Sequence, residues 1–412
     1  MRRFYWSVLL CLTVALGSLV GCSAEEGATG VGKPKDVAKA SNEFAIRLYQ
    51  KLAAGKSENL FFSPYSISSS LALLSAGAEG DTRDQMRDVL HLDMPEAAAL
   101  SGFQALAESL RSPEEYGFTL QVANRVWTDR SLKLLAPFQK LILANSKEGI
   151  GEVDFSTDST AAAKTINDWV EQETQGKIKE VVSPGVINDT TRLILANAVY
   201  FKAKWVEEFD LRGTKLAEFH VSPERTVEVP TMMQRRDHLY AKLPDLELLQ
   251  LPYEGAGRAA SMVILLPSKT AGLEAVERQL SAKNIEKWLA DVKGREVTLY
   301  LPKFKFTSSF DLNDVLSALG MNLAFDGDNA DFSRISAEKP LFLSAVVHQS
   351  FVDVNEKGTE AAAVTTGYVI SSIEDPLKPV EFRVDRPFIF LIRDRESGTI
   401  LFLGRVTNPE NG

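Results

Sequence analysis

The chain has 412 residues, 45% of them hydrophobic and 25% charged, a balance that excludes an intrinsically disordered protein. The formal net charge is −9, and it becomes −11 without the two arginines of the N-terminal start (44 basic against 55 acidic residues), so we expect no nucleic-acid partner. Both cysteines lie within the first 22 residues and the four histidines never stand at a metal-ligand spacing, so we expect no disulfide, metal or cofactor in the rest of the chain.

The N-terminus has the features of a secretory signal peptide over residues 1–21. Two arginines precede seventeen uncharged residues, and a small residue then stands at the expected cleavage site. The run Leu19-Val20-Gly21-Cys22 resembles the lipobox of bacterial lipoproteins, which implies cleavage before Cys22 and attachment of lipid to it. By the same analogy Ser23, in place of Asp, favours an outer membrane over an inner one, with the protein periplasmic or surface-exposed. The alternative is an ordinary signal peptide with an incidental cysteine.

Residues 22–40 follow as an expected flexible tether, since they are rich in Gly, Ala, Glu and Lys. From residue 41 to 412 there is no linker-like break and no internal repeat, which indicates a single folded unit. Its first predicted helix has its N-cap at Ser41 or Asn42, its stop at Gly55, and an apolar face made of Phe44, Leu48 and Leu52.

A second helix is predicted to begin after Asp158, which can cap it, and to end at Gly176. The second half of the chain is rich in strands, and the apolar runs that predict them are 193–201, 259–266, 297–306, 342–354, 388–392 and 399–406. Helices grouped first and strands later indicate an α+β fold with large antiparallel or mixed sheets. The same order disfavours a dinucleotide-binding fold.

The segment 356–372 has a composition that suits two different states. Side chains alternate with period two in a strand, and one face of this segment carries only small, uncharged residues: Thr359, Ala361, Ala363, Thr365 and Gly367. No proline occurs from 341 to 375, so each residue keeps its backbone N–H. The segment can therefore remain an exposed loop or insert as a strand with its small face against a core. The alternative is an Ala/Thr loop that never inserts.

The run from Glu356 to Ala363 resembles the hinge of the serpin family, protease inhibitors that trap their target by loop insertion. The hinge residues are Glu356, Gly358, Thr359, Glu360, Ala361, Ala362 and Ala363. The resemblance covers nearly the whole chain, and the other motifs that carry it are, in order, 59–67 (NLFFSPYSI), 167–170 with 174–178, 195–205 (LANAVYFKAKW), 331–333, 386–390 and 404–409. Each motif alone is weak, but together they are highly specific.

The resemblance implies the serpin fold, an α+β architecture with a large mixed central sheet, two smaller sheets, about nine helices and an exposed reactive loop at about 356–382. It implies a suicide inhibitor of serine, or cysteine, endopeptidases and not an enzyme. The protease cleaves the loop and forms an acyl-enzyme, and it is trapped when the loop inserts into the central sheet. Serpin loop insertion is itself a standard example of strand addition and of strain release. We expect a monomer.

The resemblance also implies a buried polar cluster where the central strands part, formed by Ser63, Asn197 and His348. His348 is then expected to form hydrogen bonds across the gap and not to act as a catalytic base. Lys303 and Glu356 match positions that commonly pair beside Trp205, near the point where the loop enters the sheet. The alternative for these two is a pair of separate surface charges, and exposed pairs contribute little in any case.

The position of the scissile bond depends on which family landmark is used for counting. Counting from the hinge glycine gives Ser372–Ile373, and counting back from Pro387-Phe388 gives Pro376–Leu377. We favour Ser372–Ile373, because the number of inserted residues is counted from the hinge. A bond that follows a proline would also be a poor substrate for a protease. Ser371 and Lys378 are the alternatives. A serine at this position suits an elastase-like or subtilisin-like protease.

Two other functions remain open at this stage. A non-inhibitory serpin-fold protein is disfavoured by the small residues of the hinge. A secreted hydrolase or solute-binding lipoprotein is disfavoured because no G-x-S-x-G motif occurs. In the predicted helix within 96–115, Arg111 stands among several glutamates, so we expect no activation by heparin.

Overall fold

The computed structural model describes residues 31–110, 118–146, 149–255, 260–359 and 378–410. Within these ranges lie nine α-helices, three 3-10 helices and fifteen strands. In chain order they are α1 (Pro34–Ala53), β1 (Leu60–Phe62), α2 (Pro64–Ser75), α3 (Gly80–Val89), α4 (Glu96–Leu110), β2 (Phe118–Asp129), α5 (Ala136–Asn145), β3 (Ile150–Val153), α6 (Ser159–Glu173), η2 (Pro184–Val186), β4 (Leu193–Lys204), η3 (Leu211–Gly213), β5 (Lys215–Ser222), β6 (Arg225–Lys242), β7 (Leu246–Pro252), β8 (Ala260–Pro267), α7 (Leu273–Gln279), α8 (Ala282–Ala290), β9 (Lys293–Pro302), β10 (Phe304–Asp311), α9 (Asn313–Leu319), η4 (Leu323–Phe325), β11 (Ala345–Asn355), β12 (Gly358–Thr359), β13 (Val380–Arg383), β14 (Phe388–Asp394) and β15 (Ile400–Val406).

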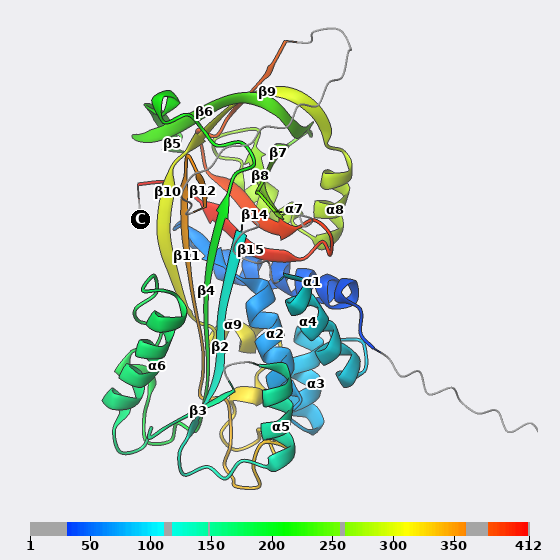
Figure 1. Ribbon diagram of the computed structural model, residues 1–412, viewed down its shortest axis with the longest axis vertical. Helices are drawn as coiled ribbons and strands as arrows, with labels where there is room; N and C mark the ends of the chain where they lie inside the picture. Colours follow the sequence, from blue (N-terminus) through cyan, green and yellow to red (C-terminus); the bar gives the residue numbers. More distant parts are fainter. Residues whose placement is uncertain (1–30, 111–117, 147–148, 256–259, 360–377, 411–412) are drawn as a thin grey trace, which may run out of the picture. The chain divides into compact units, whose positions relative to one another are not determined.

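The central layer is a six-stranded mixed sheet in the order β10-β11-β12-β4-β2-β3, with β11 also paired directly to β4. Figure 1 shows its long strands β2, β4 and β11 side by side, with α6 on one face and α2 on the other. Because both faces are covered, β4 is buried at nearly every position and reads as a continuous apolar run. Alternate residues of β4 enter the two cores: Leu195 and Val199 pack with α2, whereas Ile194 and Ala198 pack with α6.

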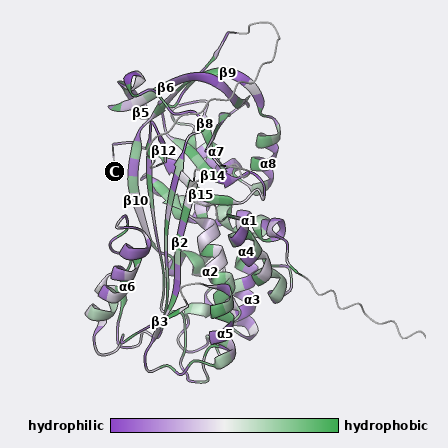
Figure 2. Cartoon of the chain, in the orientation of Figure 1, coloured by the Kyte–Doolittle hydropathy of each residue, from purple (hydrophilic) through white to green (hydrophobic). Residues whose placement is uncertain are grey.

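The second sheet has nine strands, in the order β1-β15-β14-β8-β7-β6-β9-β13 with β5 paired to β6. We expected two smaller sheets, and the structure joins them into one hydrogen-bonded sheet. The reason is the length of β6, whose 18 residues pair with β5 at one end, with β7 at the other and with β9 between. Figure 2 shows the inner strands β8, β14 and β15 coloured mainly as hydrophobic, in keeping with their nearly complete burial.

The expected tether 22–40 is wrong for its last part, because α1 already begins at Pro34. Proline is favoured at the first turn of a helix, and Val37, Ala38 and Ala40 are buried in α1 instead of lying in a solvated spacer. The N-cap is therefore Lys33, not Ser41 or Asn42. The Asn42 side chain instead donates to the carbonyl of Gly398 and accepts from the amide of Ile400, at the turn between β14 and β15.

Other expected elements lie close to their predicted places. Asp158 caps α6 through the amide of Ala161, as expected. The single strand expected over 297–306 is two strands, because the chain passes from the nine-stranded to the six-stranded sheet at Lys303. The loop expected at 356–382 is also shorter at its distal end, since β13 begins at Val380. No helix among the described residues is long and apolar enough to cross a membrane.

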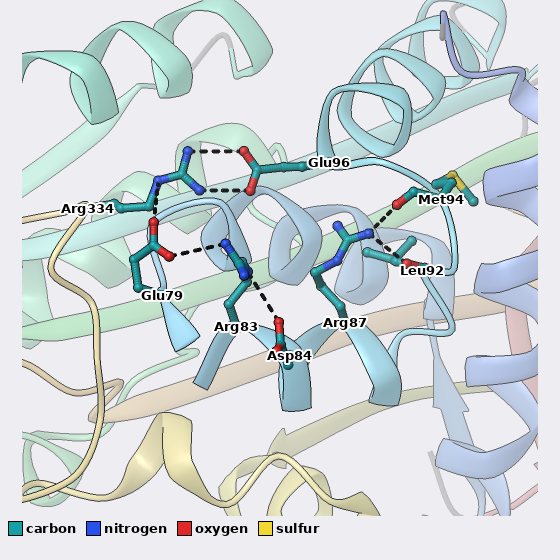
Figure 3. Close-up of polar contacts among 8 residues, drawn as sticks. All are labelled: Glu79, Arg83, Asp84, Arg87, Leu92, Met94, Glu96 and Arg334. Carbon is teal, nitrogen blue, oxygen red and sulfur yellow. Dashed lines mark hydrogen bonds and ion pairs between the residues drawn. The ribbon is translucent and has the colours of Figure 1, made fainter. Parts of the chain in front are cut away.

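Arg334, in the segment that leads to β11, ties this segment to two helices (Figure 3). Its guanidinium donates to both oxygens of Glu96 on α4, at 2.9 and 3.3 Å, and lies 3.6 Å from a carboxylate oxygen of Glu79. Glu79, next to α3, also accepts from Arg83 at 3.2 Å. Isolated exposed pairs contribute little, but several charges that share partners in one network contribute more.

Candidate functional site

The distinctive feature of the six-stranded sheet is β12, which has only two residues and lies between β11 and β4 at one end of both strands. Gly358 pairs with Lys204 of β4 and Thr359 pairs with Ala203, and the same two residues pair with β11 on the other side. From there on β11 and β4 pair directly and in parallel, over seven positions from 345–351 with 194–200. At one end of the pair, β12 therefore lies between β11 and β4. Beyond β12 these two strands form hydrogen bonds directly with each other.

Gly358 occupies a position that only glycine can adopt. Its φ is +149°, and a Cβ built there would lie 2.0 Å from the carbonyl oxygen of Ala203. Any side chain would push the strand away from β4. The glycine thus allows the chain to turn back from β11 and enter the gap beside β4.

Thr359 is completely buried, and its hydroxyl lies 2.8 Å from the hydroxyl of Tyr253. The Tyr253 ring in turn stacks on Trp205, with ring centroids 4.5 Å apart and planes 10° apart. Burial raises the pKa of Tyr253, so its hydroxyl stays protonated and can donate to the threonine. A small polar residue at 359 fits this site, whereas a large or charged one would not.

The two-residue turn between β11 and β12 is held mainly by the segment after β4. The backbone N–H of Trp205 donates to the carbonyl of Lys357 at 3.0 Å, and that of Phe209 donates to the carbonyl of Glu356 at 2.8 Å. The indole N–H of Trp205 donates to the carbonyl of Asn355 at 3.0 Å. Trp205, which the sequence places near the loop's entry, thus lies against the turn between β11 and β12.

Glu356 and Lys303 form an ion pair, with the ammonium 2.9 Å from one carboxylate oxygen and 3.1 Å from the other. Thr214 also donates to this carboxylate at 2.8 Å. Burial alone would raise the pKa of Glu356, but hydrogen bonds from Lys303 and Thr214 and the lysine charge lower it on balance. The structure therefore brings together the two charges that the sequence left as either a pair or separate.

The structure also brings Ser63, Asn197 and His348 together in the interior. His348 and Asn197 are register partners on β11 and β4, and the Nδ1 of His348 contacts the amide oxygen of Asn197. The Nε2 of His348 accepts from the backbone N–H of Ser63 at 3.1 Å. Burial lowers the pKa of His348 to about 3, so the ring is neutral at neutral pH. This contact joins the two strands that pair directly below β12.

Two members of this polar cluster had not been expected. Asn197 also donates to the hydroxyl of Ser66 at 2.7 Å and to the amide oxygen of Asn124 on β2. No local signal marks Asn124, because Gln121 and Arg125 of the same strand are polar as well. Tyr253 was also missed, and it follows a strand whose sequence gives no indication of a contact with the hinge.

Several predicted site residues lie outside the described residues: Glu360, Ala361, Ala362, Ala363, Ser371, Ser372, Ile373 and Cys22. Lys378 is described and exposed, two residues before β13 begins. The chain thus leaves the described structure after Thr359, in one sheet, and re-enters it in the other.

The arrangement provides a defined route for adding a strand. β12 is antiparallel to both β11 and β4, whereas β11 and β4 are parallel to each other. If the residues after Thr359 continued along β12, each would replace one parallel contact by two antiparallel ones, and antiparallel pairing is slightly more stable per residue. The His348–Asn197 contact would have to open for this to happen.

Comparison with known proteins identifies the family. A sequence profile described as "Serpin (serine protease inhibitor)" matches residues 39–409. The chain belongs to the serpin family. The family is described as one of serine protease inhibitors, not of enzymes. A serpin-like protein of Thermococcus kodakarensis is 43% identical over 92% of this chain and 88% of its own length, and the leukocyte elastase inhibitor of Bos taurus is 39% identical over 91% of this chain and its full length.

Solved structures resemble this one over most of the chain. Serpin48 of the insect Tenebrio molitor has a TM-score of 0.80 at 35% identity, with 91% of this chain and 98% of that chain covered. Human thyroxine-binding globulin in complex with thyroxine has a TM-score of 0.82 at 32% identity, with 91% and 99% covered. The expected serpin fold is confirmed, with its mixed central sheet and, within the described ranges, nine α-helices.

Proposed function

We propose that this serpin is an inhibitor that traps serine endopeptidases by inserting its cleaved reactive loop between β4 and β11. The observation that carries the proposal is the position of β12, which already occupies the end of the gap and runs antiparallel to both of its neighbours. Gly358 and Thr359 meet the steric and polar requirements of that position. The small uncharged residues that follow in the sequence, Ala361 and Ala363 among them, suit the same face.

The free energy available for insertion is large enough to drive the trap. A backbone hydrogen bond contributes about 0.5–1.5 kcal/mol net, so roughly ten to fifteen inserted residues, with their apolar burial, yield on the order of 10 kcal/mol. β11 has 11 residues, and at about 3.3 Å per residue the inserted strand would run roughly 36 Å beside it. A protease attached to its end would be carried along most of the sheet.

Family membership alone does not decide between inhibition and another role, since similar proteins include both an elastase inhibitor and a thyroxine-binding globulin. The hinge geometry favours inhibition. The relatives named as leukocyte elastase inhibitors support a serine protease of elastase-like specificity as the target, with a subtilisin-like protease as the second choice. This agrees with cleavage at Ser372–Ile373.

The decisive experiment is incubation with pancreatic elastase, subtilisin and trypsin, followed by denaturing gel electrophoresis and sequencing of the released C-terminal fragment. We expect a covalent adduct that survives denaturation, a fragment that begins at Ile373, and a higher melting temperature of the cleaved protein. A fragment that begins at Ser372, Leu377 or Pro379 would contradict this register and place the scissile bond at one of the alternative positions. Cleavage without any adduct and without a change in melting temperature would contradict the proposal itself and indicate a non-inhibitory serpin.

The proposal includes export and anchoring through Cys22, which rests on the lipobox-like run before it. Stable attachment to a membrane requires more than one acyl chain. Lipoproteins with a lipobox usually carry two or three. Expression in a bacterium that processes lipoproteins, followed by mass spectrometry of the N-terminal peptide, should give an acylated cysteine in the outer-membrane fraction. The Cys22→Ala variant should lose the acyl mass and leave that fraction, and an unmodified Cys22 in the native chain would contradict lipidation.

A further inference from the structure

An apolar groove lies in the nine-stranded sheet, near the end of β6 that pairs with β5. Its volume is about 650 Å³, and it is lined by residues of η3, β5, β6, β9 and β13. Six large hydrophobic side chains are exposed among the described residues, and three of them lie in or beside this groove. Leu216 is 65% exposed, Met233 is 37% exposed, and Leu211 of η3 is 65% exposed. Exposed apolar side chains that gather in one place indicate an interaction surface.

The floor of the groove is a row of side chains across three neighbouring strands. Met233 of β6 pairs with Tyr300 of β9, and Tyr300 pairs with Arg383 of β13. The Arg383 guanidinium lies over the Tyr300 ring, 3.8 Å from its centroid. The aromatic ring thereby fixes the arginine at the edge of the apolar floor. Rigid aromatic and arginine side chains are the types most enriched at the centre of protein interfaces.

The charged side chains that line this groove are mainly basic. Arg212, Lys215 and Arg383 line it together with a single acidic residue, Asp210, which pairs with Arg212 at 2.7 Å. Arg383 also pairs with Glu381 of its own strand, whereas Lys215 has no acidic partner within the described part of the chain. Arg212 donates to both carboxylate oxygens of Asp210, so Lys215 is the cation of this groove that is most open to a carboxylate from a partner. The groove therefore suits an apolar side chain flanked by carboxylates.

The groove is continuous with the strand that follows the reactive segment. Arg383, in its floor, lies on β13, which begins two residues after the exposed Lys378. A protease that holds the loop must rest its surface on neighbouring parts of the serpin. A stable interface covers about 800 Å² on each partner, more than an extended peptide of a few residues supplies.

We propose that this groove is a second docking surface for the target protease, which presents an apolar side chain with adjacent carboxylates to Leu216, Met233 and Lys215. The inference rests on the proposed function, since the partner is the protease that cleaves the loop. It goes further by assigning part of the selectivity to the folded body of the serpin. Contacts here strengthen the encounter before cleavage and leave the later insertion step unchanged.

The test uses proteases whose catalytic serine is replaced by alanine, which bind the loop without cleaving it. Dissociation constants are measured for inactive elastase, subtilisin and trypsin with the full chain and with Leu216→Ser. The matched control is Leu143→Ser, because Leu143 is 71% exposed on α5, which Figure 1 shows at the other end of the central sheet from β5 and β6. For at least one protease we expect Leu216→Ser to weaken binding about tenfold and Leu143→Ser to leave it unchanged. Lys215→Gln should reduce the salt dependence of the same binding.

The results separate this inference from the proposed function. Equal dissociation constants for the native chain and Leu216→Ser with every protease, or no measurable binding of any of them, overturn the docking surface. A change in self-association of the Leu216→Ser variant in sedimentation, with unchanged protease binding, also overturns it and assigns the groove to a second copy. Weakened binding of Leu216→Ser to an inactive protease, without an adduct from the active one, supports the docking surface and overturns inhibition.

Discussion

If the chain inhibits as proposed, replacing Thr359 by arginine should convert it from an inhibitor into a substrate. Thr359 is fully buried between β11 and β4, so the guanidinium would have to lose its water or force β12 out of the sheet. The effective penalty for burying an unpaired charge is several kcal/mol. If about 3–4 kcal/mol of it is felt at the barrier to insertion, insertion slows by about 10²–10³-fold, since about 1.4 kcal/mol corresponds to a factor of ten. The acyl-enzyme would then hydrolyse before the trap closes.

The assay is a titration of active protease, with the number of serpin molecules consumed for each protease inhibited as the readout. We expect a number close to one for the native chain, a steep rise for Thr359→Arg, and little change for Thr359→Ser, which retains the hydroxyl near Tyr253. The melting temperature of each uncleaved variant shows whether it is folded. A folded Thr359→Arg variant that still forms adducts at the native ratio would refute the reasoning about insertion at this position.

Three further predictions concern charges and pH. Burial lowers the pKa of His348 to about 3 and that of His238 to about 4, so below about pH 6.5 the unfolded chain binds protons more readily than the folded chain and stability falls. At pH 5.5 each of the two histidines costs about 1.4 kcal/mol. In urea titrations at neutral pH and at pH 5.5, His348→Gln should therefore reduce the loss of stability by about 1.4 kcal/mol. Glu356→Gln, which breaks a partly buried ion pair, should lower the free energy of unfolding by about 1–2 kcal/mol. Lys164→Gln, which breaks a pair exposed at both partners, should change it by less than about 0.5 kcal/mol, and equal effects would contradict the role of burial. Arg405→Met leaves a carboxylate without its buried partner and should cost about 3–5 kcal/mol in the same titration, and a loss under about 1 kcal/mol would contradict this.

Local patterns predicted those elements whose limits are set by nearby residues. The cap at Asp158 and the buried strand β4 follow from a capping side chain and from an apolar run, and both lie close to where they were expected. The start of α1 was missed, because a segment rich in Gly and Lys reads as a solvated linker until its Val37 is seen to be buried against the fold. The period-two pattern over 297–306 could not show that its two halves belong to different sheets.

The site was predictable where residues match a family pattern and unpredictable where it depends on contacts that are distant in sequence. The contact between Ser63, Asn197 and His348 was expected from the resemblance, although the three lie up to 285 residues apart. The hydrogen bond between Tyr253 and Thr359 spans 106 residues, and no local pattern marks either one as a partner of the other. Such contacts follow from how the two sheets pack and not from the sequence around each residue.

The short strand β12 has a kinetic consequence. Adding a strand to a sheet normally requires a costly first step, in which a free chain loses entropy to reach its neighbours before any hydrogen bond repays it. Here Gly358 and Thr359 are bonded on both sides before any protease arrives. In the proposed mechanism this nucleus is already present in the resting molecule, so only elongation would remain after cleavage. The speed of elongation would then depend on how fast β4 and β11 separate. Mutations that weaken the pairing of these two strands should accelerate loop insertion and lower the stability of the uncleaved protein.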